Sequence, residues 1–82
     1  MNHTKVNQKV KIGAVFEGLN IKPKWFFWIN KKFEVKNITY QWKSKIGDAT
    51  IIHFSVSDGT NLYELSFNQK TLEWRLENIE VE

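Results

Sequence analysis

The side chains that could support acid–base chemistry are few and lie in the middle and C-terminal half of the sequence. An imidazole beside a carboxylate can act as a general base that the carboxylate orients. Alternation along the expected strands places four polar residues side by side on one face: Gln41, His53, Glu64 and Arg75. Such a row is also typical of solvated cross-strand polar pairs. Because we expect this face to be convex, we predict that the protein is not an enzyme.

Nucleophilic and metal chemistry have weaker support. Ser55 and Ser57 share the strand and the face of His53, at about 7 Å and about 13 Å along it from the strand rise. The shorter separation exceeds a hydrogen bond, so neither serine is expected to pair with His53. The chain has no cysteine, and His3 lies in an N-terminus that we expect to be frayed. We therefore expect no catalytic residues, no metal site and no cofactor.

One apolar stretch breaks the alternation and points to the binding of flat ligands. Residues 24–29 read Lys-Trp-Phe-Phe-Trp-Ile and are apolar on both faces of a strand. With Asn30-Lys31 as the following turn, every second ring points outward and stands beside lysines. Such rings suit the stacking of unpaired bases, worth about 1–3 kcal/mol per base. The candidate binding residues are Trp25, Phe27, Lys24, Lys32 and Lys36.

The same outward rings allow other interpretations. Trp and Phe anchor protein interfaces, so the face equally fits a protein partner or self-association of the chain. Alternatively, the chain itself covers Trp25, Phe27 and Ile29, since monomers rarely leave large apolar patches exposed. The covering segment is then the N-terminal strand, the loop 18–22, or the C-terminal residues Ile79 and Val81.

Composition and charge narrow the class of protein. The 82 residues allow one domain, 1–82, and a hydrophobic fraction of 41% excludes a disordered chain. No apolar run approaches the roughly 18 residues that span a bilayer, and residues 1–20 hold no leader-like segment, so we expect a cytoplasmic protein without a membrane partner. The net charge of +3 is uneven: residues 1–45 hold ten Lys against two Glu, a net of +8, and residues 46–82 carry a net of −5. The basic half favours nucleic acid as a partner.

The elements that position these residues follow a period of two nearly everywhere. Six segments bounded by turn signals fit half-buried strands: 5–17, 24–29, 32–43, 49–57, 61–67 and 71–77. We predict an all-β fold, a six-stranded antiparallel meander curled into a small barrel or sandwich. The inward positions change phase within 32–43, which predicts a β-bulge near Lys36-Asn37. Residues 1–4 are expected to be frayed and 78–82 to form a tail.

Hairpin loops predict the strand registers. We favour a two-residue turn at Asp58-Gly59 and a four-residue loop over 68–71. The facing inward pairs would be Phe54–Tyr63 and Leu65–Trp74. Before strand 49–57, a two-residue Gly47-Asp48 turn would place Trp42 opposite His53 and mix the faces. A longer loop, which we prefer, places Tyr40 and Trp42 inward, with Trp42 opposite Ile52.

A family resemblance rests on residues spread over about 23–77. The motifs are Trp28-Ile29-Asn30-Lys31-Lys32-Phe33-Glu34-Val35, Tyr40-Gln41-Trp42, Asp58-Gly59, Leu62-Tyr63-Glu64-Leu65 and Trp74-Arg75-Leu76-Glu77. This pattern resembles a small uncharacterised bacterial all-β domain, which occurs alone and at the C-terminus of polymerase-like accessory proteins of damage-induced mutagenesis. The resemblance implies a small β module with an accessory binding role and no catalytic residues.

Overall fold

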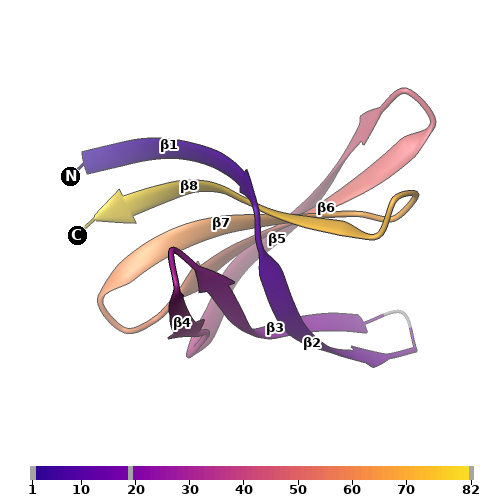
Figure 1. Cartoon of the computed structure of the whole chain (residues 1–82). Helices are drawn as coiled ribbons and strands as arrows, with labels where there is room; N and C mark the ends of the chain where they lie inside the picture. The colour runs from indigo at the N-terminus through magenta and orange to yellow at the C-terminus, as the bar shows by residue number, and fades with distance from the viewer. Residues whose placement is uncertain (1, 19, 82) are drawn as a thin grey trace.

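The computed structural model describes residues 2–18 and 20–81, and strands joined by short turns make up this part of the chain (Figure 1). It contains no helix among these residues. The all-β antiparallel class predicted from the period of two is confirmed. The strands are β1 (Asn2–Lys9), β2 (Lys11–Glu17), β3 (Asn20–Trp28), β4 (Lys31–Glu34), β5 (Asn37–Ile46), β6 (Ala49–Ser57), β7 (Asn61–Asn68) and β8 (Glu73–Val81).

These eight strands form two antiparallel sheets that are not closed into a barrel, whereas we predicted six strands in a small barrel or sandwich. One sheet has the order β1-β8-β7-β6-β5 and the other the order β2-β3-β4. The predicted number of strands is wrong because two of the expected strands each pass from one sheet to the other. The first expected strand divides at Val10 into β1 and β2, and the third divides at Val35-Lys36 into β4 and β5.

The second crossing is visible in two consecutive backbone hydrogen bonds. The N–H of Val35 donates to the carbonyl of Lys24 on β3 at 2.9 Å, and the N–H of Lys36 donates to the carbonyl of Ser57 on β6 at 2.8 Å. The predicted bulge near Lys36-Asn37 is therefore a break between strands of different sheets. The bulge itself lies between Ile38 and Tyr40, within β5.

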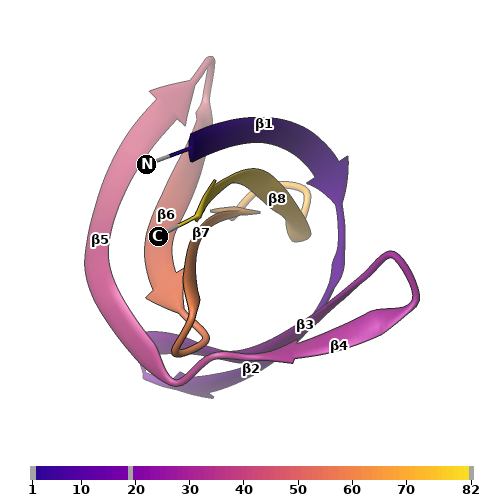
Figure 2. The same ribbon diagram turned by 90° about the vertical axis from the view of Figure 1, so that its left-hand side faces the viewer.

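The two sheets share one apolar core. From the three-stranded sheet, Phe26 on β3 is fully buried, and from the five-stranded sheet Phe54, Leu65 and Leu76 are fully buried. The alternation of apolar and polar residues in the sequence correctly predicts that Phe26, Phe54 and Leu65 point inward. Figure 2 shows the sheets facing each other across this core, with the hairpin of β3 and β4 projecting from the rest of the fold.

Two of the predicted strand pairs are displaced by two residues each. Phe54 lies opposite Leu65 instead of Tyr63, and Leu65 lies opposite Leu76 instead of Trp74. The β6–β7 loop is longer than predicted because the Asp58 side chain organises it: Oδ1 accepts the N–H groups of Thr60 and Asn61, each at 2.8 Å. A displacement of two residues keeps Phe54 and Leu65 on their predicted face. Beyond Leu65, a register shift places Glu64 opposite Asn78 and Tyr63 opposite Ile79.

The register between β5 and β6 is the one that we had not favoured. Trp42 lies opposite His53, and Ile46 lies opposite Ala49 across a two-residue Gly47-Asp48 turn with Gly47 at φ 60°. Tyr40 and Trp42 therefore point away from the core, and their predicted inward orientation is wrong. The register places them on the same face as His53 and Ser55, which lie opposite them on β6.

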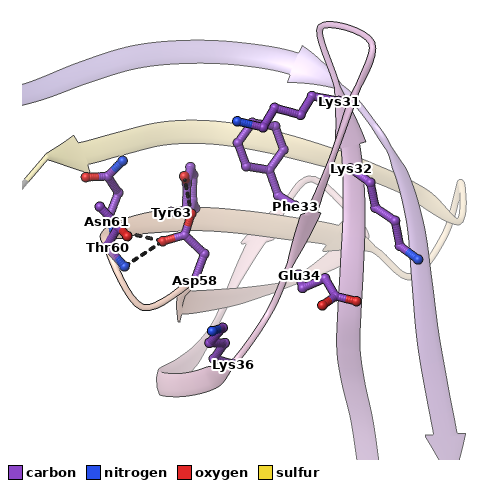
Figure 3. A pocket seen from close by; sticks show the side chains of 9 residues that line it. All are labelled: Lys31, Lys32, Phe33, Glu34, Lys36, Asp58, Thr60, Asn61 and Tyr63. Carbon is purple, nitrogen blue, oxygen red and sulfur yellow. Dashed lines mark hydrogen bonds between the residues drawn. The ribbon is translucent and has the colours of Figure 1, made fainter.

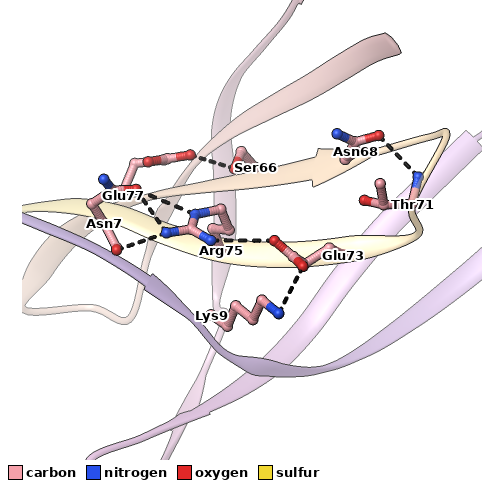
Figure 4. Close-up of polar contacts among 8 residues, drawn as sticks. All are labelled: Asn7, Lys9, Ser66, Asn68, Thr71, Glu73, Arg75 and Glu77. Atoms are coloured by element: carbon pink, nitrogen blue, oxygen red, sulfur yellow. Dashed lines mark hydrogen bonds and ion pairs between the residues drawn. The ribbon is translucent and has the colours of Figure 1, made fainter. Parts of the chain in front are cut away.

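The chain ends are paired, in contrast to the expected frayed N-terminus and free tail. Residues 2–5 of β1 lie opposite residues 78–81 of β8; Met1 and Glu82 lie outside the described residues. The register shifts between Lys5 and Gln8, where Asn7 has φ 51°. Arg75 holds this irregularity by donating to the Asn7 carbonyl at 2.9 Å and to Asn7 Oδ1 at 3.0 Å (Figure 4).

Candidate functional site

The outward rings of β3 lie between two strands that carry lysines. Phe26 is buried, so its neighbours Trp25 and Phe27 point to the opposite side of the three-stranded sheet. Phe27 lies opposite Lys11 of β2 and Lys32 of β4, and Trp25 lies opposite Gly13 and Glu34. We call this surface the aromatic–lysine face: Lys11, Gly13, Trp25, Phe27, Lys32 and Glu34.

Gly13 leaves room for the Trp25 indole. A Cβ added to Gly13 would lie 2.1 Å from Trp25 Nε1 and 2.2 Å from Cε2, so the indole rests directly on the glycine backbone. On the other side, Lys32 Nζ is 5.2 Å from the ring centroid, within the range of a cation–π contact. Trp25 is thus half-buried by side and main chains of its own sheet.

Phe27 and Ile29 remain open to solvent. Phe27 is 41% exposed and Ile29 is 67% exposed. The predicted covering segments lie elsewhere in the described chain: β2 pairs alongside β3, and Ile79 packs against the core from β8. In the loop 18–22, residue 19 lies outside the described residues. The interpretation that the chain covers these two side chains is therefore wrong for the segments that the structure places.

The turn that ends β3 differs from the predicted Asn30-Lys31. Trp28 lies opposite Lys31, so the turn residues are Ile29 at φ 47° and Asn30 at φ 58°. Asn tolerates this left-handed backbone, whereas a β-branched side chain there is strained. An exposed, strained Ile29 therefore forms the tip of the projecting hairpin, next to the aromatic–lysine face.

Two of the five predicted binding residues, Lys24 and Lys36, have no cross-strand partner in the three-stranded sheet. Lys24 is the extra residue of the β2–β3 register and is exposed. Lys36 lies where the chain changes sheets, at the edge of a hollow of about 330 Å3 that Phe33 and Tyr63 also line (Figure 3). The structure therefore brings together Trp25, Phe27 and Lys32, and adds Lys11 and Gly13, which sequence reasoning missed. A glycine at an outward strand position was the available signal for the close approach of another group.

The floor of the hollow beside Lys36 is a fixed polar pair. Tyr63 donates its hydroxyl to Asp58 Oδ2 at 2.7 Å. Burial, together with this bond to the carboxylate, raises the pKa of Tyr63 to about 12. Burial alone would raise the pKa of Asp58, but hydrogen bonds from Asn61, Tyr63 and Thr60 outweigh it and lower that pKa below its usual value. Both groups are engaged in holding the β6–β7 loop.

The predicted polar row is only partly assembled. His53 Nδ1 lies 3.4 Å from Glu64 Oε2, as the alternation predicts. Gln41 lies opposite Phe54 on the other face of the sheet, and Arg75 is engaged with Asn7. The face is not convex: His3 and Trp42, from the two edge strands β1 and β5, line one hollow of about 190 Å3. The five-stranded sheet therefore curls so that its outward face is concave.

Within residues 2–18 and 20–81, no group of three His, Asp or Glu side chains is arranged to hold a metal ion. The same part of the chain has no helix of the length and hydropathy needed to cross a bilayer. The chain matches no protein-family model, no curated protein and no solved structure. The resemblance to the bacterial all-β domain stays a prediction, and functional inference rests on the geometry of the faces described above.

Proposed function

We propose that the protein is a non-enzymatic binding module that holds single-stranded nucleic acid, alone or within a nucleoprotein partner, on the aromatic–lysine face. The observation that carries the proposal is the position of Phe27, a residue that is 41% exposed and lies between Lys11 and Lys32. A ring open to solvent offers a surface on which a base can stack. The flanking ammonium groups suit the phosphates on either side of that base.

The charges on this face support an anionic ligand. In the described part of the chain, Lys11 and Lys32 have no carboxylate within ion-pair distance. Ammonium groups without a carboxylate partner can neutralise phosphates and release the counterions bound to them. Lys24, exposed next to Trp25 in the chain, adds to the positive potential. Glu34 is the acidic residue of the face and lies opposite Trp25, away from Phe27.

Titration of a labelled single-stranded oligothymidine at about 50 mM and about 200 mM salt tests the proposal. We expect binding at the lower salt concentration, with a Kd that rises with salt. Loss of one stacked base is worth about 1–3 kcal/mol, so Phe27→Ala should weaken binding by about 5–150-fold. Tyr40→Ala is the matched control, because Tyr40 is 66% exposed on the other sheet.

The outcomes separate the proposal from its alternatives. Absence of binding at the lower salt concentration contradicts it, as does an equal loss of affinity in Phe27→Ala and Tyr40→Ala. Self-association through the same face would instead appear in light scattering as an oligomer that Phe27→Ala dissociates. That result would assign the exposed ring to a protein interface.

A further inference from the structure

A row of polar side chains crosses four adjacent strands on the concave face of the five-stranded sheet. Asn78 on β8 donates from Nδ2 to Glu64 Oε1 at 3.1 Å. Glu64 on β7 lies with Oε2 3.4 Å from His53 Nδ1 on β6. His53 Nε2 in turn lies 2.7 Å from Ser44 Oγ on β5. Hydroxyl, imidazole and carboxylate therefore follow in the order that activates a serine nucleophile.

The environment of the imidazole favours one arrangement of its proton. His53 Nδ1 is buried and makes no hydrogen bond within the described chain, and Glu64 Oε2 lies 3.4 Å from it. A carboxylate beside Nδ1 favours the tautomer with the proton on that nitrogen. The lone pair of Nε2 is then free to accept the hydroxyl proton of Ser44.

Packing holds this imidazole in place. The Trp42 ring stacks on it with a centroid separation of 5.0 Å and an interplanar angle of 4°. The His53 side chain is only 16% exposed, whereas Ser44 is exposed on edge strand β5. The base is thus shielded and oriented while the hydroxyl remains open to an incoming reagent.

We propose that Ser44 is an activated nucleophile that accepts an acyl group from small activated esters. This inference goes beyond the proposed binding function and concerns the opposite sheet. Ser44 Oγ forms a bond to the ester carbonyl carbon as its proton passes to His53 Nε2. The bond from that carbon to the leaving oxygen then breaks, and the imidazolium returns the proton to the departing alcohol or phenol. The product is an O-acyl Ser44 ester, with no oxidant or cofactor required.

The sequence alone did not reveal this row. Ser44 and His53 are brought together only by the two-residue Gly47-Asp48 turn, which also places Trp42 opposite His53. The longer loop that the alternation favoured would have moved Ser44 to the other face. The serines that share a strand with His53, Ser55 and Ser57, make no hydrogen bond to its ring in the described chain.

Acetylation by p-nitrophenyl acetate, followed by peptide mapping, tests the proposal on the intact chain. Ser55 is an internal control, because it lies on the same strand and face as His53 without contacting the imidazole. A positioned general base contributes about 10²–10⁴-fold, so we expect Ser44 to be acetylated at least about 100-fold faster than Ser55. His53→Gln should reduce the rate at Ser44 to that at Ser55, with an unchanged circular dichroism spectrum.

Glu64 acts through His53 and is a positioning residue, so its variant needs a separate readout. Glu64→Gln should lower the rate at Ser44 and leave the rate at Ser55 unchanged, because a neutral amide beside Nδ1 no longer orients the imidazole as a general base. General damage to the fold would instead change the rates at both serines, and Glu64→Asp, which keeps the carboxylate, should restore part of the rate at Ser44. Other carboxylates on this side, retained in all variants, include Glu77, which accepts from Ser66, the residue opposite His53, at 2.6 Å, and Glu80, which lines the hollow.

Two results would overturn the proposal. The first is equal acetylation of Ser44 and Ser55 in the wild-type protein, which requires no variant to fold. The second is a wild-type rate at Ser44 in a folded His53→Gln variant. Either result would leave the row as a set of cross-strand polar contacts.

Discussion

Gly13→Ala tests how the aromatic–lysine face is built. The added Cβ would lie 2.1 Å from Trp25 Nε1, 2.2 Å from Cε2 and 2.7 Å from Cζ2. Carbon atoms in contact are about 3.5–4.0 Å apart, so the indole must move by more than an ångström or the two strands must separate. A displaced indole also loses the Lys32 ammonium that lies 5.2 Å from its centroid.

The expected magnitude combines two effects of opposite sign. Forcing an extra methyl group against a packed ring costs about 1–3 kcal/mol. Replacing Gly by Ala where the backbone accepts it gains about 0.4–1 kcal/mol by restricting the unfolded chain, and Gly13 is not among the residues with positive φ. The free energy of unfolding should therefore fall by about 1–2 kcal/mol, a decrease in Tm of roughly 5–15 °C for a chain of this length.

A double-mutant cycle isolates the contact between Gly13 and Trp25. In a Trp25→Ala background the obstacle is absent, so Gly13→Ala should be neutral or stabilising by about 0.4–1 kcal/mol. Urea unfolding followed by circular dichroism measures all four proteins. An equal loss of stability from Gly13→Ala in both backgrounds would refute the arrangement of Trp25 over the glycine, as would no loss in either.

Other consequences concern the hairpin tip and the polar pair at Asp58. Ile29→Asn should raise the free energy of unfolding by about 1 kcal/mol, because the strained φ of 47° suits Asn and the side chain is 67% exposed; unchanged or lower stability in urea would count against the strain. The pKa of Tyr63 is raised to about 12 from the usual 10.0. Its hydrogen bond to Asp58 therefore contributes fully to the free energy of unfolding below pH 10, and this contribution is lost as the pH rises towards 12. Tyr63→Phe should therefore flatten the decline of Tm over that range, and an unchanged decline would contradict the assignment. The lowered pKa of Asp58 gives stability the opposite pH dependence. The Asp58 carboxylate contributes fully to the free energy of unfolding above the unfolded pKa of 3.8, and this contribution is lost at lower pH. Asp58→Asn should reduce the acid sensitivity of Tm, and an identical acid profile would contradict this role.

The sequence predicted which residues face the core better than it predicted which residues face each other. Phe54 and Leu65 are buried as the alternation requires, although their partners differ from the predicted ones by two residues. Because side chains alternate with a period of two, an even displacement leaves both faces intact. Trp42 shows the opposite case. The predicted loop before β6 differs in length from the observed two-residue turn by an odd number of residues, so the prediction placed Trp42 on the wrong face.

The candidate site was predictable as far as it depends on one strand. The outward positions of Trp25 and Phe27 follow from the local sequence of β3. Lys11 and Gly13 could not be placed beside them, because their register depends on a bulge between Gly13 and Ala14 and on the division of the first strand at Val10. Neither feature has a strong local signal in the sequence.

The most direct test of the binding face is a nuclear magnetic resonance titration of the 15N-labelled protein with single-stranded oligothymidine at low salt. We predict that the largest amide shifts fall on β2, β3 and β4, around Lys11, Phe27 and Lys32, and that β5 and β6 change little. Shifts concentrated instead around Tyr40 and Trp42, or no shifts at all, would contradict the account.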